Sequence, residues 1–149
     1  MFTSPFNFDS LDGNNGFVVR GIDEADNLGS SVSGGGDLNG DGLDDIAIAT
    51  SGATSEGETY VVFGSNESFT TEYDLTNLDG NNGFIIRGIE TTDKSFIRNI
   101  PDISLSITGD FNGDGFDDLI VGAPGAGEAI IKRKFYDEYE NYYSIREDD

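Results

Sequence analysis

Two stretches of this sequence place oxygen-bearing side chains at the spacing of a divalent-cation loop. The first begins at Asp37 and reads DLNGDGLDDIAIA, and the second begins at Asp110 and reads DFNGDGFDDLIVG. In each stretch Asp, Asn, Asp and Asp stand at positions 1, 3, 5 and 9, around a glycine at position 6. Calcium takes about six to eight hard oxygen ligands, and a flexible loop can supply several of them from alternating positions. The two stretches therefore predict calcium sites.

The spacing gives a ligand role to five residues of each loop. Alternating side chains can converge on one point, and glycines at positions 4 and 6 permit the positive φ that a tight wrap needs. Magnesium is disfavoured, because it demands octahedral geometry and keeps its waters. We expect two Ca²⁺ ions, one for each set of ligands: Asp37, Asn39, Asp41, the carbonyl of Leu43, and Asp45 in the first loop; Asp110, Asn112, Asp114, the carbonyl of Phe116, and Asp118 in the second.

The loops do not fit an EF-hand. Its position 12 should be a bidentate Glu, whereas these loops carry Ile48 and Val121 there, and no flanking helices are predicted. The remaining alternative is a Gly-Asp-rich turn without metal, and two intact copies argue against it. Asp44 and Asp117, at position 8, have no ligand role in this scheme and are expected to cap or solvate the turn.

Composition narrows the classes of partner. The chain has 149 residues, enough for one domain, and a formal net charge of −21 from 29 acidic and 8 basic residues. Nucleic acid is excluded as an expected partner, because phosphate binding needs clustered Lys and Arg. An anionic membrane surface is disfavoured for the same reason. No 18-residue apolar run is present, so no membrane insertion is expected, and the N-terminus does not resemble a signal peptide.

Catalysis is not expected in this chain. It contains no Cys, which rules out zinc thiolate sites and disulfides, and no His, so its serines lack the usual activating base. The pairs Asp44/Asp45 and Asp117/Asp118 could be imagined as glycosidase acids. Adjacent residues of a strand point to opposite faces, however, and the metal loop already uses one member of each pair. We therefore expect a protein that is not an enzyme.

The repeat is longer than the loop. The stretch LDGNNGFVVRGI from Leu11 recurs as LDGNNGFIIRGI from Leu78, and the distance to the following loop is six residues longer in the second copy. We place that insertion within about residues 90–106. Short apolar, β-branched runs bounded by Asn-Gly turns predict strands at 17–20, 31–33, 46–49 and 60–63. A repeat of this length with several strands per unit is typical of a propeller-like array.

The C-terminal end departs from the repeat. Residues 127–131 begin like residues 57–61, but Lys132-Arg133-Lys134 then follows. The aromatic residues after it have a spacing that fits one face of a helix, and a frayed charged terminus is the alternative. These residues are Phe135, Tyr136, Tyr139, Tyr142 and Tyr143.

Taken together, these stretches resemble the FG-GAP repeats of the integrin α-subunit β-propeller. The resemblance rests on Leu28-Gly29-Ser30-Ser31-Val32-Ser33 before the first loop and on Val121-Gly122-Ala123-Pro124 after the second. The ending Tyr60-Val61-Val62-Phe63-Gly64 is similar to bacterial members of the family. The resemblance covers about residues 5–131. Thr50-Ser51-Gly52 and Pro101-Asp102 depart from the family pattern.

The resemblance implies an all-β chain whose two repeats form blades of four-stranded antiparallel sheet. Family members form rings of usually about seven blades, with calcium in the loops. Two units do not close such a ring, so we expect an incomplete or fragmentary β-propeller: part of a longer one, a chain that assembles with others, or a degenerating copy. We divide the chain into a first unit (1–67), a second unit (68–131) and a divergent charged, aromatic tail (132–149).

The functional expectation is a calcium-binding module for adhesion or protein–protein interaction, located outside the cell or at its surface. Other propeller repeats or chains, or a protein or glycan ligand, are the expected partners. The alternative is a non-catalytic propeller scaffold of a larger hydrolase, whose active domain lies outside this chain.

Overall fold

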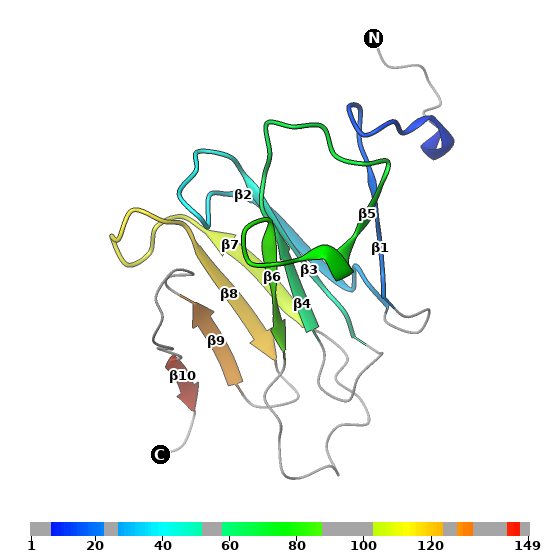
Figure 1. Ribbon diagram of the computed structural model, residues 1–149. Coiled ribbons are helices and arrows are strands. Elements are labelled where there is room, and N and C mark those ends of the chain that lie inside the picture. Colours follow the sequence, from blue (N-terminus) through cyan, green and yellow to red (C-terminus); the bar gives the residue numbers. More distant parts are fainter. Residues whose placement is uncertain are drawn as a thin grey trace.

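The two repeats fold into two four-stranded antiparallel sheets that lie against each other (Figure 1). The computed structural model describes residues 7–22, 27–51, 58–87, 103–123, 128–132 and 143–146. Strands dominate these residues, and none of their helices could span a membrane. Two single-turn 3-10 helices, η1 (Phe8–Ser10) and η2 (Leu75–Asn77), accompany the strands. The predicted all-β class, with four-stranded antiparallel blades of an incomplete propeller, is confirmed.

The first sheet has the order β2 (Ser31–Gly36), β3 (Asp45–Ala49), β4 (Glu58–Val62), β6 (Gly83–Arg87). The two middle strands have neighbours on both sides, and their apolar side chains are buried except that of Ile46, which is half-buried. β2 ends in a bulge between Gly34 and Gly36, where Gly35 has a φ of +93°. A glycine suits this left-handed backbone, which bends the strand into the loop that starts at Asp37.

The second sheet repeats this order with β7 (Ser104–Thr108), β8 (Asp118–Ala123), β9 (Glu128–Lys132) and β10 (Tyr143–Arg146). β10 pairs antiparallel with β9, Tyr143 lying opposite Ile131. For residues 143–146 the helical interpretation of the tail is therefore wrong, and so is the frayed terminus. A strand adds backbone hydrogen bonds along an open sheet edge, which the aromatic spacing alone did not reveal. The other predicted helix positions, 135–142, lie outside the described residues.

The sheet and the sequence repeat are out of phase. β6 belongs to the sheet of β2, β3 and β4, although its residues 83–87 follow position 68, where we divided the repeat units. Its counterpart in the first copy of the repeat, β1 (Val18–Arg20), joins neither four-stranded sheet of the described residues. β1 instead pairs in parallel with β5 (Glu72–Asp74), and Arg20 forms an exposed ion pair with Glu72. The predicted insertion falls mostly within residues 88–102, outside the described part.

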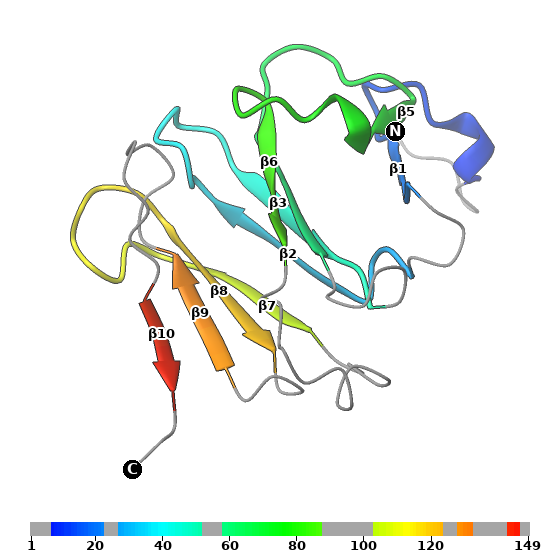
Figure 2. The same cartoon turned by 60° about the horizontal axis from the view of Figure 1, so that its bottom comes forward.

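The facing sides of the two sheets form the main core. Figure 2 shows β2 beside β7. These are the edge strands at which the two sheets meet, and we call them the inner strands. Apolar side chains from both sheets meet between them, and Leu38 of the first loop is buried among them. Removing this apolar surface from water stabilises the contact by roughly 25 cal/mol per Å² buried. The buried members of the cluster are Leu38, Ala47, Ala49, Val61, Phe63, Ile103, Leu119 and Val121.

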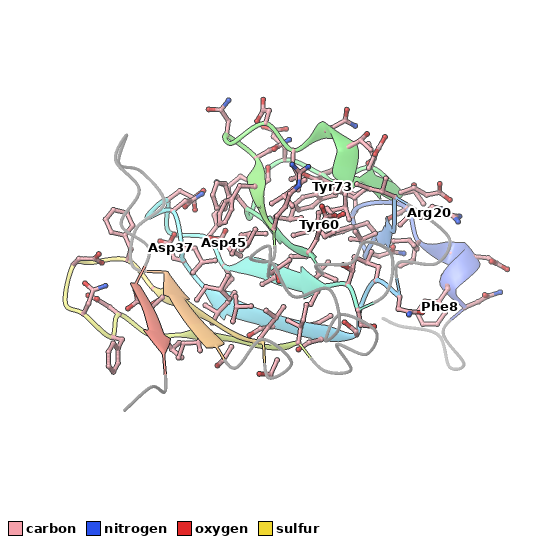
Figure 3. The ribbon with its side chains drawn as sticks, turned by 90° about the horizontal axis from the view of Figure 1, so that it is seen from below. Phe8, Arg20, Asp37, Asp45, Tyr60 and Tyr73 are labelled. Carbon is pink, nitrogen blue, oxygen red and sulfur yellow. The ribbon has the colours of Figure 1, made fainter. Side chains whose placement is uncertain are left out.

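A second cluster covers the outer half of the opposite side of the first sheet. Tyr60, Val62 and Leu75 are buried in it, and residues of β1 and β5 pack around them. Figure 3 shows Tyr60 and Tyr73 in this region, away from Asp37 and Asp45. β1 and β5 thus cover the part of this face formed by β4 and β6, and Val32 of β2 stays exposed.

Candidate functional site

The two candidate loops occupy the same place in the two sheets. Residues 37–44 join β2 to β3, and residues 109–117 join β7 to β8. In each loop the glycines at positions 4 and 6 have positive φ: +81° and +85° for Gly40 and Gly42, and +78° and +92° for Gly113 and Gly115. The sequence therefore correctly predicted where both loops lie and that their glycines have positive φ.

The aspartate at position 1 organises each loop. Asp37 Oδ1 accepts hydrogen bonds from the backbone N–H of Gly40 (2.7 Å) and Asp41 (3.1 Å), and its Oδ2 accepts one from Gly42 (2.7 Å). Backbone N–H groups thus hold this carboxylate in the middle of the wrap. Oδ1 already accepts two hydrogen bonds, whereas Oδ2 accepts one and keeps a lone pair with which to bind a cation.

Asp110 repeats this arrangement in the second loop. It accepts from Gly113 (2.6 Å), Asp114 (3.0 Å) and Gly115 (2.8 Å). These bonds favour the charged form, so they hold the pKa of Asp110 below its ordinary value, the bond from Gly115 contributing most. The same fold of the loop therefore appears twice around a charged carboxylate.

The aspartate at position 9 is buried at the start of the following strand. Asp45 is 0% exposed and accepts from the backbone N–H of Leu38 (2.7 Å) and Gly64 (2.8 Å). Burial raises the pKa of Asp45, its two N–H partners oppose that change, and the charges of Asp41 and Asp37 raise the pKa further. A cation near these three carboxylates would offset both the desolvation and the mutual repulsion. Figure 3 shows Asp37 and Asp45 close together.

The amide side chains at position 3 are turned toward other predicted ligands. Asn39 Nδ2 donates to Asp41 (3.0 Å), whereas Asn112 Nδ2 donates to Asp118 Oδ1 (3.0 Å). Asp118, like Asp45, is buried, and it accepts from the N–H of Phe111 (2.7 Å). In this conformation internal donors occupy part of the oxygen set that the sequence assigned to metal.

The structure brings the predicted ligands into two short loops, but it does not gather their carboxylates. Among the described residues no three acidic side chains converge into a group that could hold a metal ion. The chemistry of the donors nevertheless fits calcium, because each loop offers three carboxylates, one amide oxygen and backbone carbonyls. The ligand sets, including the carbonyls of Leu43 and Phe116, remain predictions.

The first loop is also a joint between the two sheets, which sequence reasoning missed. The N–H of Asp37 donates to Asp117 Oδ2 (2.8 Å), and the N–H of Asp117 donates to the carbonyl of Asp37 (3.0 Å). A Cβ on Gly40 would lie 2.4 Å from the ring of Phe116, so the second loop packs closely on the first. We expected Asp117 only to cap or solvate its own turn. The repeated Asp-Asp pair was the signal, but only the packing reveals its partner.

Replacing Asp117 by alanine is expected to lower the free energy of unfolding by about 1–3 kcal/mol, because the half-buried N–H of Asp37 loses a charged acceptor. Asp44→Ala is the matched control. Asp44 holds the same loop position and is exposed, so its replacement should change stability by no more than about 0.5 kcal/mol. Urea unfolding in a chelator measures both. Equal losses from the two substitutions would contradict a joint at Asp117.

Comparisons with known proteins agree with this geometry. The FG-GAP repeat matches the chain over residues 28–62 and 103–140, and each match contains one of the two loops. The chain is also similar to the integrin alpha pat-2 of Caenorhabditis elegans, with 32% identity over 118 residues. That similarity covers 76% of the chain but only 9% of the relative, so the chain spans a small part of the relative's length.

Proposed function

Since this chain carries two repeats of the FG-GAP family, we propose that it is a calcium-binding β-propeller module for adhesion or protein–protein contact outside the cell. The observation that supports calcium binding most is the repeated wrap of each loop around its first aspartate. Three backbone N–H groups fix that carboxylate in both copies. The two loops have different neighbours, yet their backbones wrap around the first aspartate in the same way, as expected if both loops bind the same ion.

The proposed ligands are those that the spacing assigned. Asp37, Asn39, Asp41, the carbonyl of Leu43 and Asp45 would hold one ion. The second loop would hold another through Asp110, Asn112, Asp114, the carbonyl of Phe116 and Asp118. At present the amide groups of Asn39 and Asn112 donate to Asp41 and Asp118, which are themselves proposed ligands. A bound ion would neutralise part of the charge of each loop and tie the start of a buried strand to the loop before it.

The proposed role in adhesion rests on the name of the relative and on the kind of repeat. An integrin alpha chain is similar to this one, and FG-GAP repeats of that kind suit protein partners. An extracellular location would also provide calcium at the level such modules use, with dissociation constants of about 10⁻⁴–10⁻³ M. The net charge of −21 suits a surface that cations partly neutralise.

Isothermal titration calorimetry of the chelator-treated protein tests the calcium sites directly. We expect two ions per chain for the unaltered protein and one for each of Asp41→Ala and Asp114→Ala, because each removes a carboxylate from one loop. Both residues are exposed, so the substitutions should leave the fold intact.

Asp44→Ala is the matched control for this titration, since it removes one neighbouring charge without removing a proposed ligand. It should keep both ions. The absence of measurable binding at about 10 mM calcium would contradict the proposal. So would a loss of binding in Asp44→Ala equal to that in Asp41→Ala.

A further inference from the structure

Equivalent residues of the two loops differ sharply in exposure. Leu38, at position 2 of the first loop, is 1% exposed, because the second sheet covers it. Phe111, at position 2 of the second loop, is 71% exposed. A single exposed apolar side chain is common on a protein surface, but here the same position of the other loop is buried. Among the described residues, the second sheet covers position 2 of the first loop, and no sheet covers position 2 of the second loop.

The glycines beside the loops show the same difference. A Cβ on Gly36 would lie 2.4 Å from Ile107 Cγ2, and one on Gly40 would lie 2.4 Å from Phe116 Cε1. Their counterparts Gly109 and Gly113 face open space: a Cβ would reach only Asp117 at 4.0 Å from Gly109, and nothing within 4 Å from Gly113. Glycine permits a close approach at all four positions, but only the first pair is approached.

The inner strands carry the hydrogen bonds of the contact. Ser31 Oγ accepts from the N–H of Leu105 (3.1 Å), and Ser33 Oγ accepts from the N–H of Ile107 (2.9 Å). Ser104 and Ser106 of β7 precede their loop by the same number of residues as Ser31 and Ser33 precede theirs, and both are exposed. They present the same acceptors on the side of β7 that points away from the first sheet.

The opposite side of β2 offers the complement of this surface. Val32 and Gly34 are the counterparts of Leu105 and Ile107, and Val32 is 66% exposed. Asp44, the counterpart of Asp117, is exposed as well. β1 and β5 cover the outer half of this side, but they leave the inner strand β2 accessible. Figure 2 shows that the existing contact between the sheets also uses their inner strands.

We propose that the second sheet binds a second copy of this chain, head to tail. The side of β7 and its loop that points away from the first sheet would contact the β2 strand and Asp44 of that copy. In this contact the N–H groups of the partner copy's inner strand donate to the serines, and its Asp44 carboxylate accepts from the N–H of Asp110. A second copy is the occupant because its β2 strand and Asp44 are the repeat counterparts of β7 and Asp117, which form this contact inside the chain. The binding surface consists of Ser104, Ser106, Gly109, Asp110, Phe111 and Gly113.

A head-to-tail contact uses two different surfaces, so it continues into open arcs, or closes into a ring if the rotation permits. Both surfaces are mostly uncharged, but the whole chains carry −21 each and repel one another. Salt screens this repulsion, so association should strengthen as ionic strength rises. The proposal does not rest on calcium binding, and it can be tested in a chelator.

Sedimentation of two blocked variants, alone and mixed, tests the contact. Val32→Arg blocks the β2 side and Ser106→Arg blocks the β7 side, and both residues are exposed, so each variant should fold. At high salt the unaltered protein should form species larger than a monomer as its concentration rises. Each variant alone should stay monomeric. Their equimolar mixture should form a dimer of one copy of each, because each supplies the surface that the other lacks.

Asn66→Arg, which adds the same charge at an exposed site on neither surface, should associate like the unaltered protein. Circular dichroism and thermal melting establish that every variant is folded. Three results would overturn the proposal: an unaltered protein that stays monomeric up to about 1 mM, single variants that associate as the unaltered protein does, or folded variants that remain monomers when mixed.

Discussion

Millimolar calcium is expected to raise the melting temperature of this protein by about 5–10 °C over that in a chelator. A ligand that binds only the folded state stabilises it by RT ln(1 + [L]/Kd), which is about 1.4 kcal/mol per site when calcium is tenfold above Kd. Two sites double this gain. For a domain of this length, each kcal/mol corresponds to a shift of roughly 2–4 °C. Differential scanning calorimetry with and without calcium measures the shift.

Ligand variants show how much each loop contributes to the calcium-induced rise in melting temperature. Asp41→Ala and Asp114→Ala should each lose about half of it, and the double variant should melt at one temperature whether calcium is present or not. Asp44→Ala should keep the full rise, which separates the loss of a ligand from the loss of a charge. Magnesium at the same concentration should give a much smaller shift, because it resists giving up its waters. A melting temperature that calcium leaves unchanged would argue against stabilising metal sites in either loop.

The sequence predicted the strands and loops well because their signals are local. Four-residue apolar runs bounded by turn residues identified the strands, and the glycines of the loops required a backbone that few other residues adopt. Position 9 followed from spacing alone, and Asp45 does stand where the loop enters the strand.

What the sequence did not reveal depends on contacts between distant residues. Asp44 and Asp117 hold the same position of two closely similar loops, yet among the described residues only Asp117 bonds to another loop, because only Asp117 faces a neighbouring sheet. The parallel pairing of β1 with β5 and the strand at Tyr143 likewise follow from which sheet edges are open. Spacing could not show either pairing, nor that the amide groups of Asn39 and Asn112 donate to the carboxylates of Asp41 and Asp118.

The contact between the sheets predicts the largest effect of a single substitution. Leu38→Ala should lower the free energy of unfolding by about 2–5 kcal/mol, because it opens a cavity in the cluster that both sheets share. Phe111→Ala, at the same position of the second loop, should change the stability of the monomer by no more than about 0.5 kcal/mol, since that side chain is exposed. Urea unfolding in a chelator compares the two without a contribution from calcium.

Comparing Leu38→Ala with Phe111→Ala also tests self-association, because Phe111 lies on the surface proposed to bind a second copy. If a second copy covers Phe111, as Leu38 is covered within the chain, Phe111→Ala should weaken self-association while leaving the monomer stable. Dilute protein at low salt reports the monomer, and concentrated protein at high salt reports the association. A large loss of monomer stability in Phe111→Ala would show that the second loop is already packed. An equally small loss in both variants would mean that the two sheets do not depend on Leu38 to stay together.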